Sequence, residues 1–354
     1  MNITFLIGNG FDLGVGVRSK FSDYFPIYCE EAKGIGILHR GLADKIEEDI
    51  EHCSYFERQL GIYTGEFWGD RTDVFWRQFQ DFELGFIQYL KQEEATLSFD
   101  KKDEIEKQMR KGLLNFYSEE NLRPGSSDKI KKIFSQKYRE DHWYNFLSFN
   151  YTMILENCLK AIPNGVLTTR TNSGRSLIEK VTYIHGTCDG YPIMGVNDAS
   201  QIENPIWAKD EKFLCRIVKP RSNERNRSNS DRDGAEIIKR SNIICVYGMS
   251  LGETDRNWWD RIINWLYADP TRQLVLFLRD RNYSTSSQLA FMDKEDEIVE
   301  KLSQFSTNES IAVEDLLPRI HIAVNRNIFQ MNFLRDNDES EARVVAEQRD
   351  LATV

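Results

Sequence analysis

MNITFLIGNGFDLG, residues 1–14, is the stretch that decides the fold class of this chain. Its first seven residues form a β-branched and apolar run, and Gly8-Asn9-Gly10-Phe11-Asp12-Leu13-Gly14 follows at once. A buried strand that breaks into glycines and then into a helix is how α/β proteins hold a phosphate, because the glycines allow a close approach and the helix start attracts anions. The second interpretation is an ordinary strand-to-helix turn with glycines for steric reasons. The G-x-G-x-x-x-G spacing departs from the strict dinucleotide fingerprint, so both interpretations stay open here.

The composition narrows the class of protein. The chain has 354 residues, of which 40% are hydrophobic and 12% aromatic, enough for one large domain or two. The net charge of −10 argues against non-specific binding to nucleic acid, which needs clustered Lys and Arg. No apolar run reaches the length of a membrane span or of a signal peptide, so we expect a cytoplasmic protein. The six cysteines include no C-x-x-C pair, which argues against a structural zinc site and for reduced thiols.

The order of apolar runs predicts an α/β core interrupted by helices. We expect the core in residues 1–35 and 141–330, a helical insertion or lid in 36–140, and an acidic C-terminal tail in 331–354 that is frayed from Asp336 onward. Within the insertion, an aromatic stripe at helical spacing predicts a helix that packs over the sheet; it comprises Phe75, Phe79, Phe82, Phe86, Ile87 and Leu90. The segment 219–233 is rich in Arg, Asn, Ser and Asp, and we expect an exposed, mobile connection there.

Four predicted strands end in polar or glycine-rich turns. These turns are Gly8–Gly14, Asn150–Thr152, His185–Gly186 and Gly248–Gly252. In an open and largely parallel sheet, ligands bind at the carboxyl ends of the strands. All four turns should therefore face one crevice, and this convergence is more specific than any single motif.

Three side chains of these turns are candidates for chemistry. His185 follows a strand directly and precedes a glycine, and a pKa near neutrality suits a general base. Asn150 carries a donor and an acceptor, so it can orient a water or a sugar hydroxyl; it can also simply cap the following helix. Asp12 can cap a helix, bind a ribose hydroxyl or act as an acid, and the sequence does not rank these roles.

Five motifs together resemble the bacterial AbiH family of phage abortive-infection proteins. In chain order they are Ile7–Leu13, Phe149–Thr152, Tyr183–Gly186, Met194–Asn197 and Tyr247–Gly252. The resemblance spans roughly residues 3–267, and the middle helices are its least diagnostic part. It implies a role in defence against phage.

The same series is similar, more distantly, to the sirtuin superfamily and its defence-linked NAD hydrolases. That resemblance implies a Rossmann-like, sirtuin-like core in which Asn150 orients water and the nicotinamide-side ribose, and His185 acts as base on a ribose hydroxyl. It also implies that NAD is held by the first turn and by two later motifs, at Gly8, Asn9, Gly10, Phe11, Asn197, Gly248, Ser250 and Leu251. Asn9 and Asp12 depart from the sirtuin pattern. The zinc-binding cysteine pairs of deacetylases are absent too, which counts against deacetylation more than against NAD cleavage.

The leading hypothesis is therefore an antiphage protein that hydrolyses NAD+ to nicotinamide and ADP-ribose, with no metal and no cofactor beyond this substrate. Asn150, His185 and Asp12 are its candidate catalytic residues. A non-catalytic nucleotide sensor is the first alternative, and a nuclease or another toxin is the second. A phage trigger protein and a second copy of the chain are the partners that such a protein would use for control.

Overall fold

The computed structural model describes residues 1–35, 40–48, 56–67, 72–168, 174–280, 282–283 and 287–335. At its centre lies a seven-stranded sheet with the spatial order β3-β4-β2-β1-β5-β6-β7. The strands are β1 (Asn2–Ile7), β2 (His142–Ser148), β3 (Val166–Thr168), β4 (Ser176–Tyr183), β5 (Ile243–Tyr247), β6 (Gln273–Leu278) and β7 (Ile320–Val324). β3 runs antiparallel to β4, and the other neighbouring strands pair in parallel. The expected α/β class with a largely parallel sheet is confirmed.

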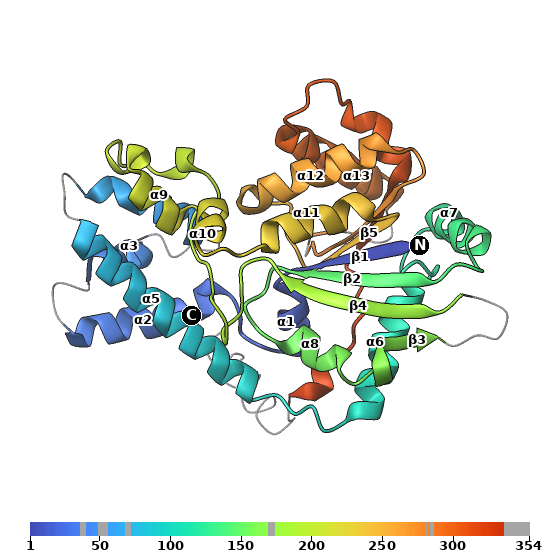
Figure 1. Ribbon diagram of the computed structural model, residues 1–354, viewed down its shortest axis with the longest axis horizontal. Helices are drawn as coiled ribbons and strands as arrows, with labels where there is room; N and C mark the ends of the chain where they lie inside the picture. Colours follow the sequence, from blue (N-terminus) through green and yellow to red (C-terminus); the bar gives the residue numbers. More distant parts are fainter. Residues whose placement is uncertain are drawn as a thin grey trace.

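Helices cover both faces of the sheet because the parallel strands are apolar on both sides. In β1, Phe5 faces one core cluster while the next residue, Leu6, faces another. The first face is covered by α1 (Gly10–Val15), α6 (Lys102–Asn115), α7 (Pro124–Gln136) and α8 (Ile154–Leu159). The second face is covered by α11 (Ser230–Arg240), α12 (Arg256–Ala268) and α13 (Gln288–Phe305). Figure 1 shows α11–α13 above the sheet and α1, α6 and α8 below it.

A third, strongly aromatic cluster lies beyond the carboxyl ends of the strands, to the left in Figure 1. It is built by α2 (Phe21–Ile35), α3 (Arg40–Glu48), α4 (Phe56–Tyr63), α5 (Thr72–Ala95) and α9 (Glu211–Ile217), and α10 (Lys219–Arg225) packs against α9. The aromatic stripe of α5 is buried as expected, and Phe82 stacks on Phe56 with ring centroids 4.0 Å apart. The helices expected as one insertion thus fall into two groups, because α6 and α7 pack on the sheet.

Several local expectations are wrong. Residues 219–233 are not an exposed connection: they form α10 and the start of α11, and Lys219, Ser222 and Asn223 are buried. Pro124 starts α7, where its missing N–H costs no hydrogen bond. Residues 331–335, expected to begin the acidic tail, belong to the core, since Met331 and Leu334 are fully buried. The expected acidic tail from 336 onward lies outside the described residues.

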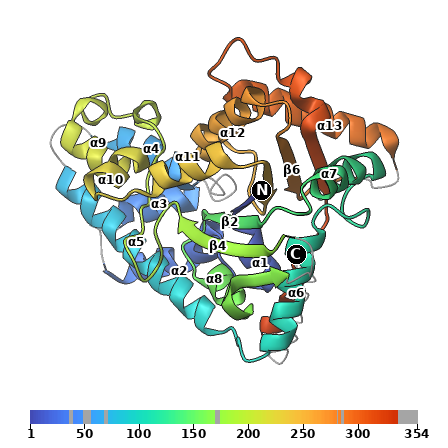
Figure 2. The same cartoon turned by 45° about the vertical axis from the view of Figure 1, so that its right-hand side comes forward.

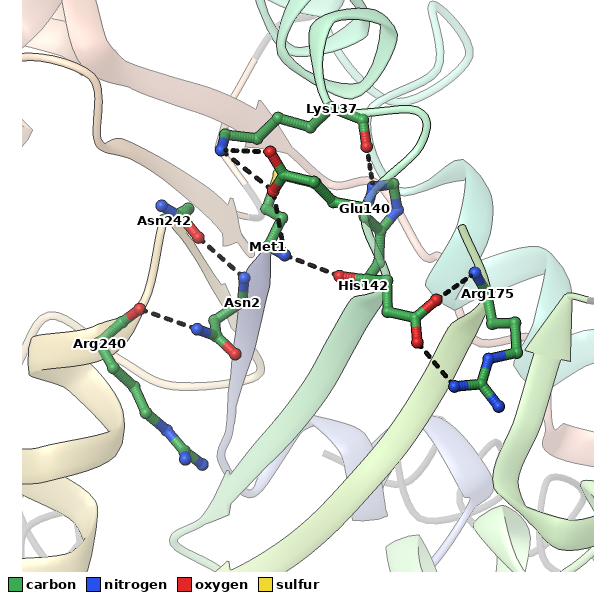
Figure 3. A network of polar contacts seen from close by, with 9 residues as sticks. Met1, Asn2, Lys137, Glu140, His142, Arg175, Arg240 and Asn242 are labelled. Carbon is green, nitrogen blue, oxygen red and sulfur yellow. Dashed lines mark hydrogen bonds and ion pairs between the residues drawn. The ribbon is translucent and has the colours of Figure 1, made fainter. Parts of the chain in front are cut away.

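The amino edge of the sheet is closed by polar groups that satisfy one another (Figure 3). The amino group of Met1 donates to Asp141 O at 2.7 Å and lies 3.6 Å from a carboxylate oxygen of Glu140. Lys137 pairs with Glu140 at 3.2 Å, and Arg175 pairs with Asp141 at 2.7 Å. These contacts hold the amino ends of β1, β2 and β4 together.

Candidate active-site cleft

A cleft of about 1170 Å³ opens between the carboxyl edge of the sheet and the aromatic helical cluster. Its sheet wall consists of the turns after β1, β2, β4 and β5, which contribute Gly8, Gly10, Asn150, His185 and Gly248 among others. Its helical wall includes Phe21, Phe56, Glu57 and Phe86, from α2, α4 and α5. The four strand-end turns do converge on one crevice, as the sequence predicts. Its volume lies slightly above the usual range of small-molecule and cofactor sites, which is about 300–1,000 Å³.

The glycines of the first turn bring two strand ends together. A Cβ atom added to Gly8 would lie 2.6 Å from Gly248 O, and one added to Gly10 would lie 2.6 Å from Gly248 Cα. Gly248 itself has φ +74°, a conformation that favours glycine. The N–H groups of Gly8 and Gly10 donate to Tyr247 O at 3.0 Å and Gly248 O at 2.8 Å. These contacts favour the steric interpretation of the glycines, because their closest neighbours are backbone atoms of the β5 turn.

We expect Gly10→Ala to lower the free energy of unfolding by about 1–3 kcal/mol, because the new methyl group overlaps immobile backbone. Gly14→Ala is the matched control: its Cβ would meet no atom closer than Tyr247 Oη at 3.9 Å, and alanine favours helix by up to about 1 kcal/mol. Urea unfolding of the two variants should thus give changes of opposite sign. Equal stability of Gly10→Ala and the native chain would mean that the two turns are not packed as described.

Asp12 is buried and holds the first two candidate turns in register. Its carboxylate accepts a hydrogen bond from Asn150 Nδ2 at 2.9 Å and one from Thr152 Oγ1 at 2.6 Å. Asn150 Nδ2 also donates to Gly8 O at 3.2 Å, so both amide protons are engaged and the side-chain orientation is fixed. Neither Asp12 nor Asn150 caps a helix through its side chain. Asp12 is therefore a positioning residue for Asn150.

Burial raises the pKa of Asp12 from 3.8 to about 7, although the hydrogen bonds from Thr152 and Asn150 oppose this rise. A carboxyl group with a raised pKa in the folded state stabilises the fold below its unfolded pKa. That stability is lost as the pH rises through the folded pKa.

We therefore expect the native chain to lose about 4 kcal/mol between pH 4 and pH 8 through this group, at about 1.4 kcal/mol per pKa unit. Asp12→Asn should remove that loss, so its stability relative to the native chain should increase with pH. Urea unfolding at several pH values measures the difference, and a constant difference would contradict the raised pKa.

His185 lies against the aromatic side chains of Phe149 and Tyr151, with ring centroids 5.7 Å and 6.3 Å away. Burial, followed by the nearby charge of Lys219, lowers the pKa of His185 well below 6.5. The imidazole is therefore neutral at pH 7 and keeps one nitrogen that can accept a proton. Two buried atoms beside the cleft, His185 Nδ1 and Asn150 Oδ1, have no hydrogen-bond partner among the described residues.

Sequence reasoning missed a buried charged group on the helical wall. Lys219 Nζ lies 2.5 Å from the carboxylate of Glu57, and both side chains are largely excluded from solvent. Asp255 directly precedes α12 but makes no capping hydrogen bond, and it lines the cleft; burial raises its pKa to about 6. The apolar residues Phe213, Leu214, Ile217 and Val218 precede Lys219 at helical spacing and could have signalled its burial.

The remaining candidate residues divide into two groups. Asn9 and Ser250 line the cleft, and Asn9 Nδ2 donates to Ser19 O at 3.3 Å. Phe11, Asn197 and Leu251 do not line it. Phe11 packs edge-on against Phe329 in the core, the N–H of Asn197 donates to Gln201 Oε1 at 2.7 Å, and Leu251 packs on the cluster below α12.

The fold and the cleft define an α/β protein with a polar pocket at the carboxyl edge of a parallel sheet. In the part of the chain that the structure describes, no three His, Cys, Asp or Glu side chains gather as metal ligands, and no helix is long and apolar enough to cross a membrane.

The sequence model of one family, described as bacteriophage abortive infection AbiH, matches residues 4–277. The chain therefore belongs to the AbiH family, which implies a role in phage defence by abortive infection. No curated protein matches the chain.

Proposed function

We propose that the cleft binds NAD+ and hydrolyses its nicotinamide–ribose bond, with release of nicotinamide and ADP-ribose. The observation that carries this proposal is the pair of unpartnered buried atoms, Asn150 Oδ1 and His185 Nδ1, beside one cleft. Buried polar atoms normally have partners, so a ligand rich in hydroxyl groups, together with a water, suits this position. Counted in chain order, the six parallel strands are arranged 3-2-1-4-5-6, the order of dinucleotide-binding sheets, and this supports a Rossmann-like, sirtuin-like core.

The proposed reaction passes through an oxocarbenium-like state, as glycoside cleavage does in general. The oxygen of a water forms a bond to the anomeric carbon, the electrons of the C–N bond move to the nicotinamide nitrogen, and the water loses a proton. Asn150 would accept a hydrogen bond from this water through Oδ1, because its Nδ2 is committed to Gly8 and Asp12. Neutral His185 would accept the proton of a ribose hydroxyl, the resulting alkoxide would take the proton that the water loses, and His185 would then release its proton to solvent. Depletion of NAD+ would then halt an infected cell.

The test is incubation of the purified chain with NAD+, followed by chromatography for nicotinamide and ADP-ribose. Asn150→Ala is compared with Asn226→Ala, an exposed asparagine on α10's carboxyl side that lies outside the cleft. Products from the native chain and from Asn226→Ala, but not from Asn150→Ala, support the proposal. Equal product formation by Asn150→Ala overturns the assignment of the site. Calorimetric binding of NAD+ without any product would replace the hydrolase with a nucleotide sensor.

A further inference from the structure

The far end of the cleft, beyond β6 and β7, carries two arginines that the proposed hydrolysis does not use. Arg279 follows β6 and Arg326 lies just after β7, and both line the cleft and are exposed. Within the residues that the structure describes, neither guanidinium makes a hydrogen bond or an ion pair. Unpaired guanidinium groups in a cleft are suited to a phosphate, which they can bind through two parallel hydrogen bonds.

A single asparagine holds the two arginine-bearing turns together. Asn325 has φ +56°, a left-handed conformation that asparagine tolerates. Its N–H donates to Leu278 O at 2.8 Å, its Oδ1 accepts from the N–H of Asp280 at 2.9 Å, and its Nδ2 donates to Asp280 O at 2.6 Å. These bonds fix the backbone of the two turns relative to each other. Arg279 and Arg326, which flank the bonded residues, therefore extend from fixed backbone positions.

The carboxylate next to Arg279 is already paired with a lysine. Asp280 directly follows Arg279, and its Oδ2 lies 2.8 Å from Lys294 Nζ while its Oδ1 accepts from the N–H of Asn282 at 2.9 Å. These contacts hold the pKa of Asp280 below its ordinary value. The charge of the carboxylate is thus balanced by Lys294, and the arginines retain their positive charge for a ligand.

The distance between the carboxyl ends of β4 and β6 indicates which phosphate of a dinucleotide the two arginines would bind. His185 follows β4, and four strand spacings of about 4.8 Å separate β4 from β6, or roughly 19 Å. A dinucleotide whose scissile ribose lies between Asn150 and His185 extends along the cleft toward β5 and β6. Its diphosphate, midway between the two riboses, would then lie over β1 and β5, and its adenosine ribose would lie near β6.

We propose that Arg279 and Arg326 bind a phosphate on the adenosine ribose, so that the cleft prefers a 2′-phosphorylated dinucleotide of the NADP+ type. This inference rests on the proposed function, because the proposed reaction fixes which end of the ligand lies at His185. It does not rest on the family, since the family match ends at residue 277, before both arginines.

The test is calorimetry with two probes that differ by one phosphate: adenosine 5′-monophosphate and adenosine 2′,5′-bisphosphate. We expect the full chain to bind the bisphosphate at least about tenfold more tightly, which corresponds to one good charged contact. Arg279→Ala and Arg326→Ala should each remove most of this preference and leave the monophosphate affinity unchanged. Arg232→Ala, an exposed arginine on α11 outside the cleft, is the control and should change neither affinity.

Three results would overturn the inference. The first is equal affinity of the native chain for the two probes, and the second is no binding of either. The third is a loss of adenosine 5′-monophosphate binding in the arginine variants with the bisphosphate preference intact, which would place the arginines at the 5′-phosphate. Because none of these probes contains nicotinamide, the outcome is independent of whether the chain hydrolyses NAD+.

Discussion

His185→Ala should lower the rate of NAD+ hydrolysis by about 10²–10⁴-fold, the usual contribution of a positioned acid or base. The imidazole is neutral at pH 7 because burial and the charge of Lys219 lower its pKa, so one ring nitrogen is an acceptor; the same two effects make it a weaker base than the near-neutral histidine that the sequence led us to expect. Its ring makes no hydrogen bond with the described residues, and Nδ1 is unpartnered. Alanine therefore removes proton acceptance and some packing against Phe149 and Tyr151, without breaking a polar network.

His142→Ala is the matched control for this prediction. His142 is also a largely buried histidine of the same sheet, packed edge-on against Phe134 at 5.2 Å, but it belongs to the amino edge shown in Figure 3. We expect it to lose stability and to retain hydrolysis. Initial rates of nicotinamide release, together with urea unfolding of both variants, separate the two effects. Full activity of a folded His185→Ala variant would exclude His185 from the reaction.

The strands and their terminal turns could be predicted from the sequence because each feature is local. Ile243–Tyr247 and Ile320–Val324 are short apolar runs, and the structure begins and ends β5 and β7 at those residues. A fully buried parallel strand reads as a continuous apolar run whatever its neighbours are. Parallel strands have their carboxyl ends on the same side of the sheet. The common location of the turns at Asn150 and His185 could therefore be predicted as well.

The helical wall of the cleft could not be predicted in this way. Glu57 and Lys219 lie on different helices, and their burial depends on the aromatic cluster that joins α4 to α9, the helix directly before α10 (Figure 2). A charged residue in a polar segment is usually solvated, so composition favoured a loop at 219–233. The role of Gly8 and Gly10 also depended on a partner far along the chain, Gly248, whose position no local pattern specifies.

The ion pair between Glu57 and Lys219 gives the second large prediction. The side chain of Lys219 is 4% exposed and that of Glu57 is 12% exposed, so each charge depends on the other for compensation. Removal of one partner from a buried pair leaves an isolated charge and costs about 3–5 kcal/mol. We expect Lys219→Met and Glu57→Gln each to lower the free energy of unfolding by an amount in this range. An exposed pair, Lys131 with Glu119, is the control, and Lys131→Met should change stability little.

The double variant, Lys219→Met with Glu57→Gln, decides whether the loss comes from the unpaired charge. Neither side chain is then charged, so the desolvation cost disappears and the stability should return most of the way to that of the native chain. The double variant also removes the cation nearest His185, and the pKa of His185 should rise toward 6.5 while burial still keeps it below that value. Urea unfolding measures the first effect and NMR titration of the His185 ring the second. Additive losses in the double variant would contradict the pairing, because they would mean that each side chain stabilises the helical wall on its own.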